Sequence, residues 1–254
     1  MKNIQLPVIP DFDTWRLHAR HLLAEKIHPS DVTWNGTADL FAADTNKAPI
    51  PKLASEKVPR EFIDQAKTAI HHSSPTRYAL LYRILWRILH ENKNIMFWTT
   101  DNDIIALKNM CKAVRRDAYK IKAFVRFREM ANGDFVAWYE PEHFSLELSV
   151  PFFCTRFANM NWSILTPYRA AHWNDGTLTW SAAPDRASYP TEDKIEDYWK
   201  TYYANIFNPA RIKKKAMLAQ MPKKYWKNMP ETDLVGPLLR SAHAKVEAMI
   251  ERSK

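Results

Sequence analysis

The sequence predicts an α+β fold: helices packed on a small, mostly antiparallel sheet, followed by a helical C-terminal region. Two observations lead to this fold. Residues 78–89 carry apolar side chains at helical spacing, which is typical of a buried helix. Phe124–Arg128 alternates apolar and basic residues, Asn132-Gly133 signals a turn, and Phe135–Tyr139 returns, so these residues predict a β-hairpin.

The remaining elements follow from the same patterns. Asp11 or Asp13 can cap a first helix that ends at His28-Pro29. Further helices are expected at Arg60–His71, from Ser74-Pro75 through the apolar stripe, at Asp103–Lys122 and at Phe152–Met160. Short strands are expected at Val32–Trp34, Asp39–Phe41, Trp162–Leu165 and Thr177–Trp180.

The length of 254 residues suits one large domain, and we expect a single globular α+β domain over residues 1–254. Residues 44–59 lose periodicity and gain proline, which marks a candidate sub-boundary. Residues 191–254 form the basic C-terminal region, with helices expected at Thr191–Ile206, Pro209–Met221 and Asp233–Arg252.

The composition excludes several classes of function. The chain has only four glycines and neither a GxGxxG nor a P-loop motif, so no nucleotide-binding loop is expected. Cys111 and Cys154 are its two cysteines, and they make no CxxC pair, so we expect no cofactor, no metal site and buried thiols in a reducing compartment. Because no secretory signal or membrane-spanning stretch is visible, a cytoplasmic location without a membrane partner is expected.

The net charge of +9 favours a polyanionic partner, with nucleic acid first and an anionic membrane second. Net charge alone also fits a protein whose basic side chains only keep it in solution. The positive charge is concentrated in two stretches, residues 112–128 and residues 206–230, and the second contains no carboxylate. The candidate nucleic-acid-binding residues are Arg115, Arg116, Lys120, Lys122, Arg126, Arg128, Arg156, Arg211, Lys213, Lys214, Lys215, Lys223, Lys224, Tyr225 and Lys227.

Lysine and arginine in these stretches can neutralise phosphates, and Tyr225 can offer a stacking surface for an unpaired base. The alternative is that the cations form solvated faces or internal salt bridges. Tyr225 and Trp226 would then be core anchors, because large aromatic side chains are usually buried.

Candidate acid–base groups lie near the end of the predicted hairpin. Glu140, Glu142 and His143 follow its second strand, and Asp117 lies in the basic helix. Carboxylates and an imidazole can serve as general acid, general base or metal ligands. The alternative is a polar strand end that forms salt bridges with the basic helix.

Several of these segments together resemble a known family. The resembling segments are Val114–Asp117, Ala123–Arg128, Ala137–His143, Arg156-Phe157, Trp162–Pro167, Tyr202–Arg211 and Met221–Asn228. In this order they resemble the bacterial "probable DNA metabolism protein" family, an uncharacterised conserved domain. That family carries His and Met where Tyr119 and Ile121 stand here, so no role of that histidine carries over.

The resemblance implies a setting in DNA repair. Family members are associated with a putative radical-SAM DNA repair protein, and in some bacteria the domain is fused to a uracil-DNA-glycosylase-type domain. It supplies no catalytic residue, so whether the chain is an enzyme stays open. Three hypotheses follow: a DNA-binding accessory protein that acts with such a partner, an enzyme acting directly on DNA or nucleotides, and a protein–protein adaptor with a basic surface.

Overall fold

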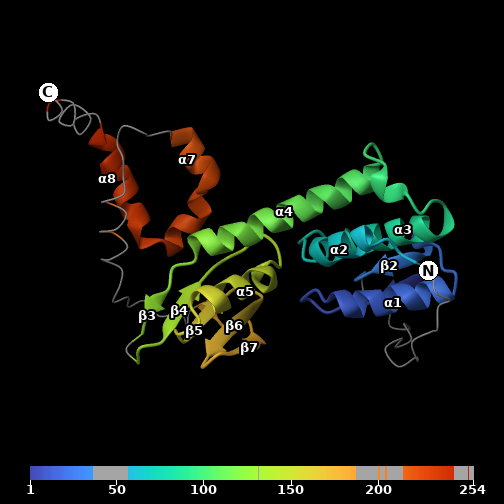
Figure 1. The fold of residues 1–254 in the computed structure, drawn as a ribbon, viewed down its shortest axis with the longest axis horizontal. Coiled ribbons are helices and arrows are strands. Elements are labelled where there is room, and N and C mark those ends of the chain that lie inside the picture. Colours follow the sequence, from blue (N-terminus) through green and yellow to red (C-terminus); the bar gives the residue numbers. More distant parts are fainter. Residues whose placement is uncertain are drawn as a thin grey trace. The chain divides into compact units, whose positions relative to one another are not determined.

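The computed structural model describes residues 1–36, 57–130, 132–186 and 214–242, with the single positions 200, 204 and 251. It confirms the α+β class, because helices accompany a five-stranded mixed sheet and a small parallel sheet (Figure 1). The chain divides into two compact units. Unit 1 comprises residues 1–119 and 142–147, and unit 2 comprises residues 120–141 and 148–254. The expected single domain stays a prediction, and the sub-boundary at 44–59 lies mostly outside the described residues.

Unit 1 is built on four helices around one apolar core. They are α1 (Phe12–Ala24), α2 (Arg60–Ala69), α3 (Arg77–His90) and α4 (Asn102–Phe124), with the short helix η3 (Ile95–Phe97) between α3 and α4. The backbone N–H of Thr14 donates to the Asp11 carboxylate over 2.8 Å, which confirms the predicted cap of α1. The predicted apolar stripe of α3 is also confirmed, since Tyr78, Leu81 and Ile88 are buried in the core.

A small parallel sheet completes unit 1. It pairs β1 (Lys2–Ile4) with β2 (Val32–Trp34), which follows the short helix η1 (Pro29–Asp31). The β2 strand is the one predicted from sequence, and its Trp34 ring lies 6.1 Å from the ring of Tyr78. The strand expected at 39–41 lies outside the described residues.

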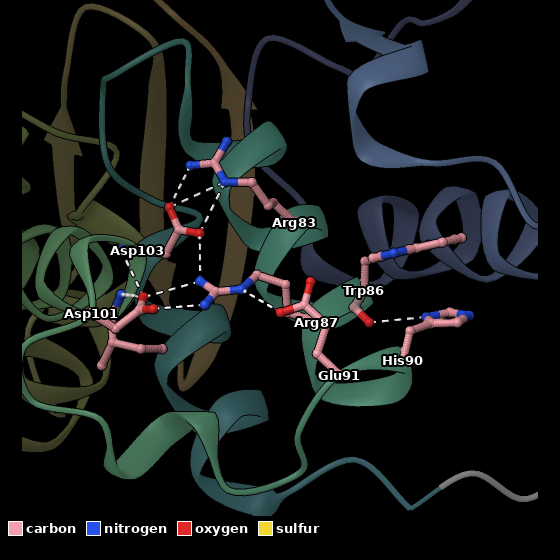
Figure 2. Close-up of polar contacts among 8 residues, drawn as sticks. Arg83, Trp86, Arg87, His90, Glu91, Asp101 and Asp103 are labelled. Carbon is pink, nitrogen blue, oxygen red and sulfur yellow. Dashed lines mark hydrogen bonds and ion pairs between the residues drawn. The ribbon is translucent and has the colours of Figure 1, made fainter.

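The corner between α3 and α4 is held by a network of charged side chains (Figure 2). Arg87 donates to both oxygens of Asp101, over 3.1 and 2.7 Å, and to Asp103 over 2.9 Å. The Asp101 carboxylate also accepts the backbone N–H groups of Asp103 and Ile104, so it caps the first turn of α4. The hydrogen bonds from Arg87 hold the pKa of Asp101 below its usual range.

Unit 2 contains the larger sheet, whose strands run β3-β4-β5-β6-β7 from edge to edge. The strands are β3 (Arg128–Glu129), β4 (Phe135–Trp138), β5 (Trp162–Leu165), β6 (Arg169–Asn174) and β7 (Thr177–Ala182). All neighbours are antiparallel except β4 and β5, which are parallel. A parallel pair needs a crossover, and α5 (Leu146–Arg156) lies in that connection.

Aromatic packing joins α5 to the sheet. The ring of Phe153 on α5 lies 6.0 Å from the rings of both Trp162 and Phe127. These side chains are buried, so this cluster forms the core beside the central strand β5.

Two local expectations were wrong in their bounds, and one strand was missed. The first hairpin strand does not begin at Phe124, because α4 runs through that residue and Arg126 donates to the carbonyls of Ala123 and Val125 at the helix end. The hairpin itself is confirmed, with Gly133 at φ +87° in its turn. The helix expected at 152–160 begins earlier, at Leu146, and includes Pro151. The β6 strand was not predicted, because its two alanines give little strand preference.

The C-terminal region is helical in its described part. It contains α7 (Lys214–Gln220), η6 (Lys223–Asn228), η7 (Pro230–Leu234) and α8 (Val235–Arg240). The helix expected at Thr191–Ile206 lies outside the described residues except for positions 200 and 204.

Replacing Arg87 with Ala is expected to lower the free energy of unfolding by about 2 kcal/mol, because Asp101 loses its main cationic partner in a half-buried site. Arg60→Ala is the matched control. Arg60 pairs with Asp64, but its side chain is 93% exposed against 19% for Arg87, so its loss should cost less than about 0.5 kcal/mol. Urea titration of both variants measures the difference, and equal losses would contradict the assigned role of the network.

Candidate nucleic-acid interface

One face of α4 carries a row of exposed side chains that we call the α4 stripe. Its members are Lys108, Lys112, Arg115, Arg116 and Tyr119. At 3.6 residues per turn these five positions fall within an arc of about 100°. The opposite arc carries Leu107, Cys111 and Val114, which are buried in unit 1. The stripe is therefore the solvent face of an amphipathic helix.

The four cations of the α4 stripe have no ion-pair partner in the part of the chain that the structure describes. The two carboxylates of α4 are both engaged elsewhere. Asp103 receives hydrogen bonds from Arg83 and Arg87, and Asp117 is buried. Like charges on one helix face repel one another, and an anion laid along the face would relieve this repulsion.

Tyr119 is the aromatic member of the stripe, and the sequence analysis did not predict it as a binding residue. It is 72% exposed, in contrast to most aromatic side chains that the structure describes. Its position was readable from the sequence, because it lies four residues after Arg115 and opposite Val114 on the helix. Only Arg115 and Arg116 of the stripe were among the predicted nucleic-acid-binding residues.

Two predicted cations of unit 2 are engaged by carboxylates. Arg126 forms an ion pair of 2.8 Å with Glu231, which is buried. Lys227 donates to Glu140 over 2.7 Å. Burial alone would raise the pKa of Glu140, but hydrogen bonds from Lys227 and Trp138 hold it below its usual range. These two cations therefore serve the internal packing of unit 2.

Another group of predicted residues meets around the ring of Tyr225. Lys120 and Lys224 place their Nζ atoms 5.5 and 4.8 Å from the ring centroid. The ring also stacks on Phe124 and on Tyr139, at 5.4 and 5.2 Å, and is only 3% exposed. Stacking of a base on Tyr225 would therefore require this packing to open.

The other predicted basic residues differ in exposure, and Lys122, Arg156 and Lys223 each lie over an aromatic ring. The exposed ones in unit 2 are Lys122, Arg156, Lys215 and Lys223. Arg128 is half-buried on β3. Arg211 and Lys213 lie outside the described residues, as does the side chain of Lys214. Whether any of them binds nucleic acid stays a prediction.

Three of the four candidate acid–base residues come together in unit 1. The Asp117 carboxylate accepts the backbone N–H groups of Glu142 and His143, over 3.2 and 3.0 Å. It also accepts the Ser145 hydroxyl over 2.7 Å. Asp117 thus fixes the backbone of this loop. Glu140 belongs to unit 2, where it bonds Trp138 and Lys227.

His143 lies in a cluster of imidazole and hydroxyl groups. Its Nδ1 atom is 2.9 Å from the Ser73 hydroxyl, and its ring stacks on His72 at 4.3 Å between centroids. The His72 Nδ1 accepts the backbone N–H of Ser74. Burial lowers the pKa of His72, and the neighbouring His143 and Arg77 lower it further.

The cysteines do not form a reactive pair. Cys111 is buried in unit 1, where its thiol donates to the Gln65 carbonyl over 3.3 Å. Burial raises the pKa of the Cys111 thiol to about 11, which keeps it protonated at neutral pH. Among the described residues, no group of three or more His, Cys, Asp or Glu side chains is arranged to hold a metal ion.

A family model for a domain of unknown function, DUF4130, matches residues 75–231, which is more than half of the chain. The chain belongs to the DUF4130 family. This match confirms the prediction that the chain contains an uncharacterised conserved domain. The DUF4130 region contains the whole α4 stripe, the loop from Glu140 to His143 and the sheet of unit 2. Neither a curated protein nor a solved structure matches the chain.

No helix among the described residues is both long and apolar enough to cross a bilayer.

The lowered pKa of His72 predicts a pH-dependent stability. A histidine whose pKa is lower in the folded state binds protons more readily when unfolded, so its contribution is present at pH 8 and is lost as the pH falls below about 6.5. His72→Asn, whose Oδ1 can replace Nδ1 as acceptor, should therefore show a smaller drop in melting temperature from pH 7.5 to 5.5 than the unmodified chain. His21→Asn on α1 is the control and should keep the full drop.

Proposed function

We propose that this protein is a DNA-binding accessory protein in DNA metabolism or repair, working in the cytoplasm. The observation that supports the proposal most directly is the α4 stripe, where four exposed cations share one helix face without a carboxylate beside them. A sequence-independent contact to phosphates needs only such a row of positive charge.

The dimensions of the stripe suit a nucleic-acid backbone. Lys108 and Tyr119 are separated by eleven residues of helix, which is about 16 Å at 1.5 Å per residue. Phosphates along one strand of B-DNA recur about every 3.4 Å of helix axis, so the stripe faces roughly four to five nucleotides. Binding to the stripe would release the counterions of those phosphates, which makes the affinity strongly dependent on salt.

The proposed partner is a radical-SAM or uracil-DNA-glycosylase-type protein that carries out the chemistry. This part of the proposal rests on the resemblance to the DNA metabolism family, whose members are associated with such proteins. In this arrangement the chain described here holds the DNA and the partner modifies or excises the base.

An enzyme acting directly on DNA or nucleotides is the second candidate. One observation favours it: the Ser73 hydroxyl lies 2.9 Å from the His143 imidazole, within reach for proton transfer. Release of a base or a nick in DNA by the isolated chain, abolished in His143→Asn, would support this candidate. A chain that binds DNA and leaves it intact would count against it.

Reversing two charges of the α4 stripe provides the test of DNA binding. Lys112→Glu combined with Arg116→Glu should weaken DNA binding at least about tenfold and reduce the slope of log K against log salt by about 1.5, because two phosphate contacts are lost. Fluorescence anisotropy of a labelled oligonucleotide between 50 and 200 mM salt measures both quantities.

The charge-matched control is Lys57→Glu combined with Lys67→Glu. Both lysines are exposed in unit 1, before and on α2, so the net charge changes equally while the stripe stays intact. Affinity and salt slope should stay close to those of the unmodified chain. If the two double variants bind alike, the stripe is not the binding surface.

A pull-down from cells with and without nuclease treatment tests the partner. A radical-SAM or glycosylase-type protein retained after nuclease treatment indicates direct association. One lost with the nucleic acid indicates that DNA bridges the two. A protein partner bound while DNA is ignored would support instead the third candidate, an adaptor with a basic surface.

A further inference from the structure

Two more exposed aromatic side chains precede the α4 stripe. Phe97 is 72% exposed and Trp98 is 43% exposed, at the end of η3. Their backbone is ordered by hydrogen bonds: the N–H of Trp98 donates to Ile95, and that of Asp101 donates to Trp98. Since Asp101 caps α4, both rings lie directly at the amino end of this helix, within unit 1.

These exposed rings contrast with three large aromatic side chains of unit 1. Trp15, Phe62 and Tyr78 are fully buried in its core. Within the described residues, neither Phe97, Trp98 nor Tyr119 has a ring or cation neighbour. Large aromatic side chains are costly to leave in water. Tyr119 within the α4 stripe and two more rings at the amino end of the same helix therefore indicate a surface that a ligand covers.

A ligand that runs along α4 and over its amino end would meet two chemistries. Lys108, Lys112 and Arg115 favour a chain of negative charges, while Phe97, Trp98 and Tyr119 favour flat apolar groups. A DNA duplex offers only the first, because its base faces are stacked inside the helix. A single strand offers both, since its phosphates and its unstacked bases are accessible together.

We propose that α4 and its amino end bind single-stranded nucleic acid, with unpaired bases stacked on Phe97, Trp98 and Tyr119 and the phosphates along the cations of the α4 stripe. The inference rests on the proposed DNA-binding function and names its substrate class. From the first residue of α4 to Tyr119 the helix rises about 26 Å, a length that roughly eight nucleotides span at about 3.4 Å each.

The single-strand preference is tested with the full chain and two labelled probes, a 12-nucleotide oligo(dT) and a 12-base-pair duplex hairpin. Fluorescence anisotropy should show at least about tenfold tighter binding of the single strand. Phe97→Ala combined with Trp98→Ala, and separately Tyr119→Ala, should each weaken single-strand binding roughly 5- to 100-fold while duplex binding and salt slope change little.

Conservative and remote variants serve as controls. Tyr119→Phe keeps a ring for stacking and should retain single-strand binding, whereas Tyr119→Leu keeps apolar area without a ring and should lose it. Val8→Ala changes an exposed apolar residue near the N-terminus and should have no effect. Because all these side chains are exposed, the melting temperatures should stay within about 2 °C of the unmodified chain.

The possible results separate this inference from the proposed function. Equal affinity for both probes, unchanged in the alanine variants, would overturn the single-strand inference and leave DNA binding standing. Absence of binding to either probe would overturn both. Single-strand binding that survives the alanine variants, together with a protein partner that depends on the same rings, would show that the aromatic surface docks a protein instead.

Discussion

The candidate surface depends on the charged corner between α3 and α4. Arg87 on α3 holds Asp101, and Asp101 in turn caps the first turn of α4 and fixes the residues that follow η3. The direction in which α4 leaves this corner decides which of its faces meets the core. Because Leu107 and Cys111 occupy that core, the basic residues on the opposite side of the helix are left in solvent. The ion pair between Arg87 and Asp101 thus helps to position the α4 stripe, which lies several helical turns away.

Similar residues have different roles in the two units. Arg115 and Arg126 both belong to the first basic stretch, yet Arg115 is exposed on the stripe and Arg126 is paired with the buried Glu231. A buried carboxylate requires a partner, so Arg126 is needed for the stability of unit 2. Net charge therefore overstates the charge available to a polyanion. The useful quantity is the number of cations left without an internal carboxylate.

The sequence predicted most of the fold where side chains repeat with a clear period. The helical spacing of apolar residues predicted α3, and the Asn132-Gly133 turn predicted the hairpin of β3 and β4. Both signals depend only on residues close together in the sequence. β6 and the start of α5 were not predictable in this way, since their partners lie far along the sequence. The same holds for the candidate binding residues. The sequence predicted the exposed arginines of α4, but it did not predict that Lys227 pairs with Glu140. The exposure of Phe97 and Trp98 depends on tertiary packing and needed the folded chain.

The loop that Asp117 fixes has a consequence for how this protein can be dissected. Residues 142–147 belong to unit 1, although the chain on both sides of them belongs to unit 2. Each unit is therefore assembled from two separate stretches of polypeptide, and no single cut yields either one whole. A fragment ending near residue 119 would lose the segment that satisfies its own buried carboxylate. The two units are interlaced along the chain, so insertion, exchange or loss of one during evolution would have to carry part of the other with it.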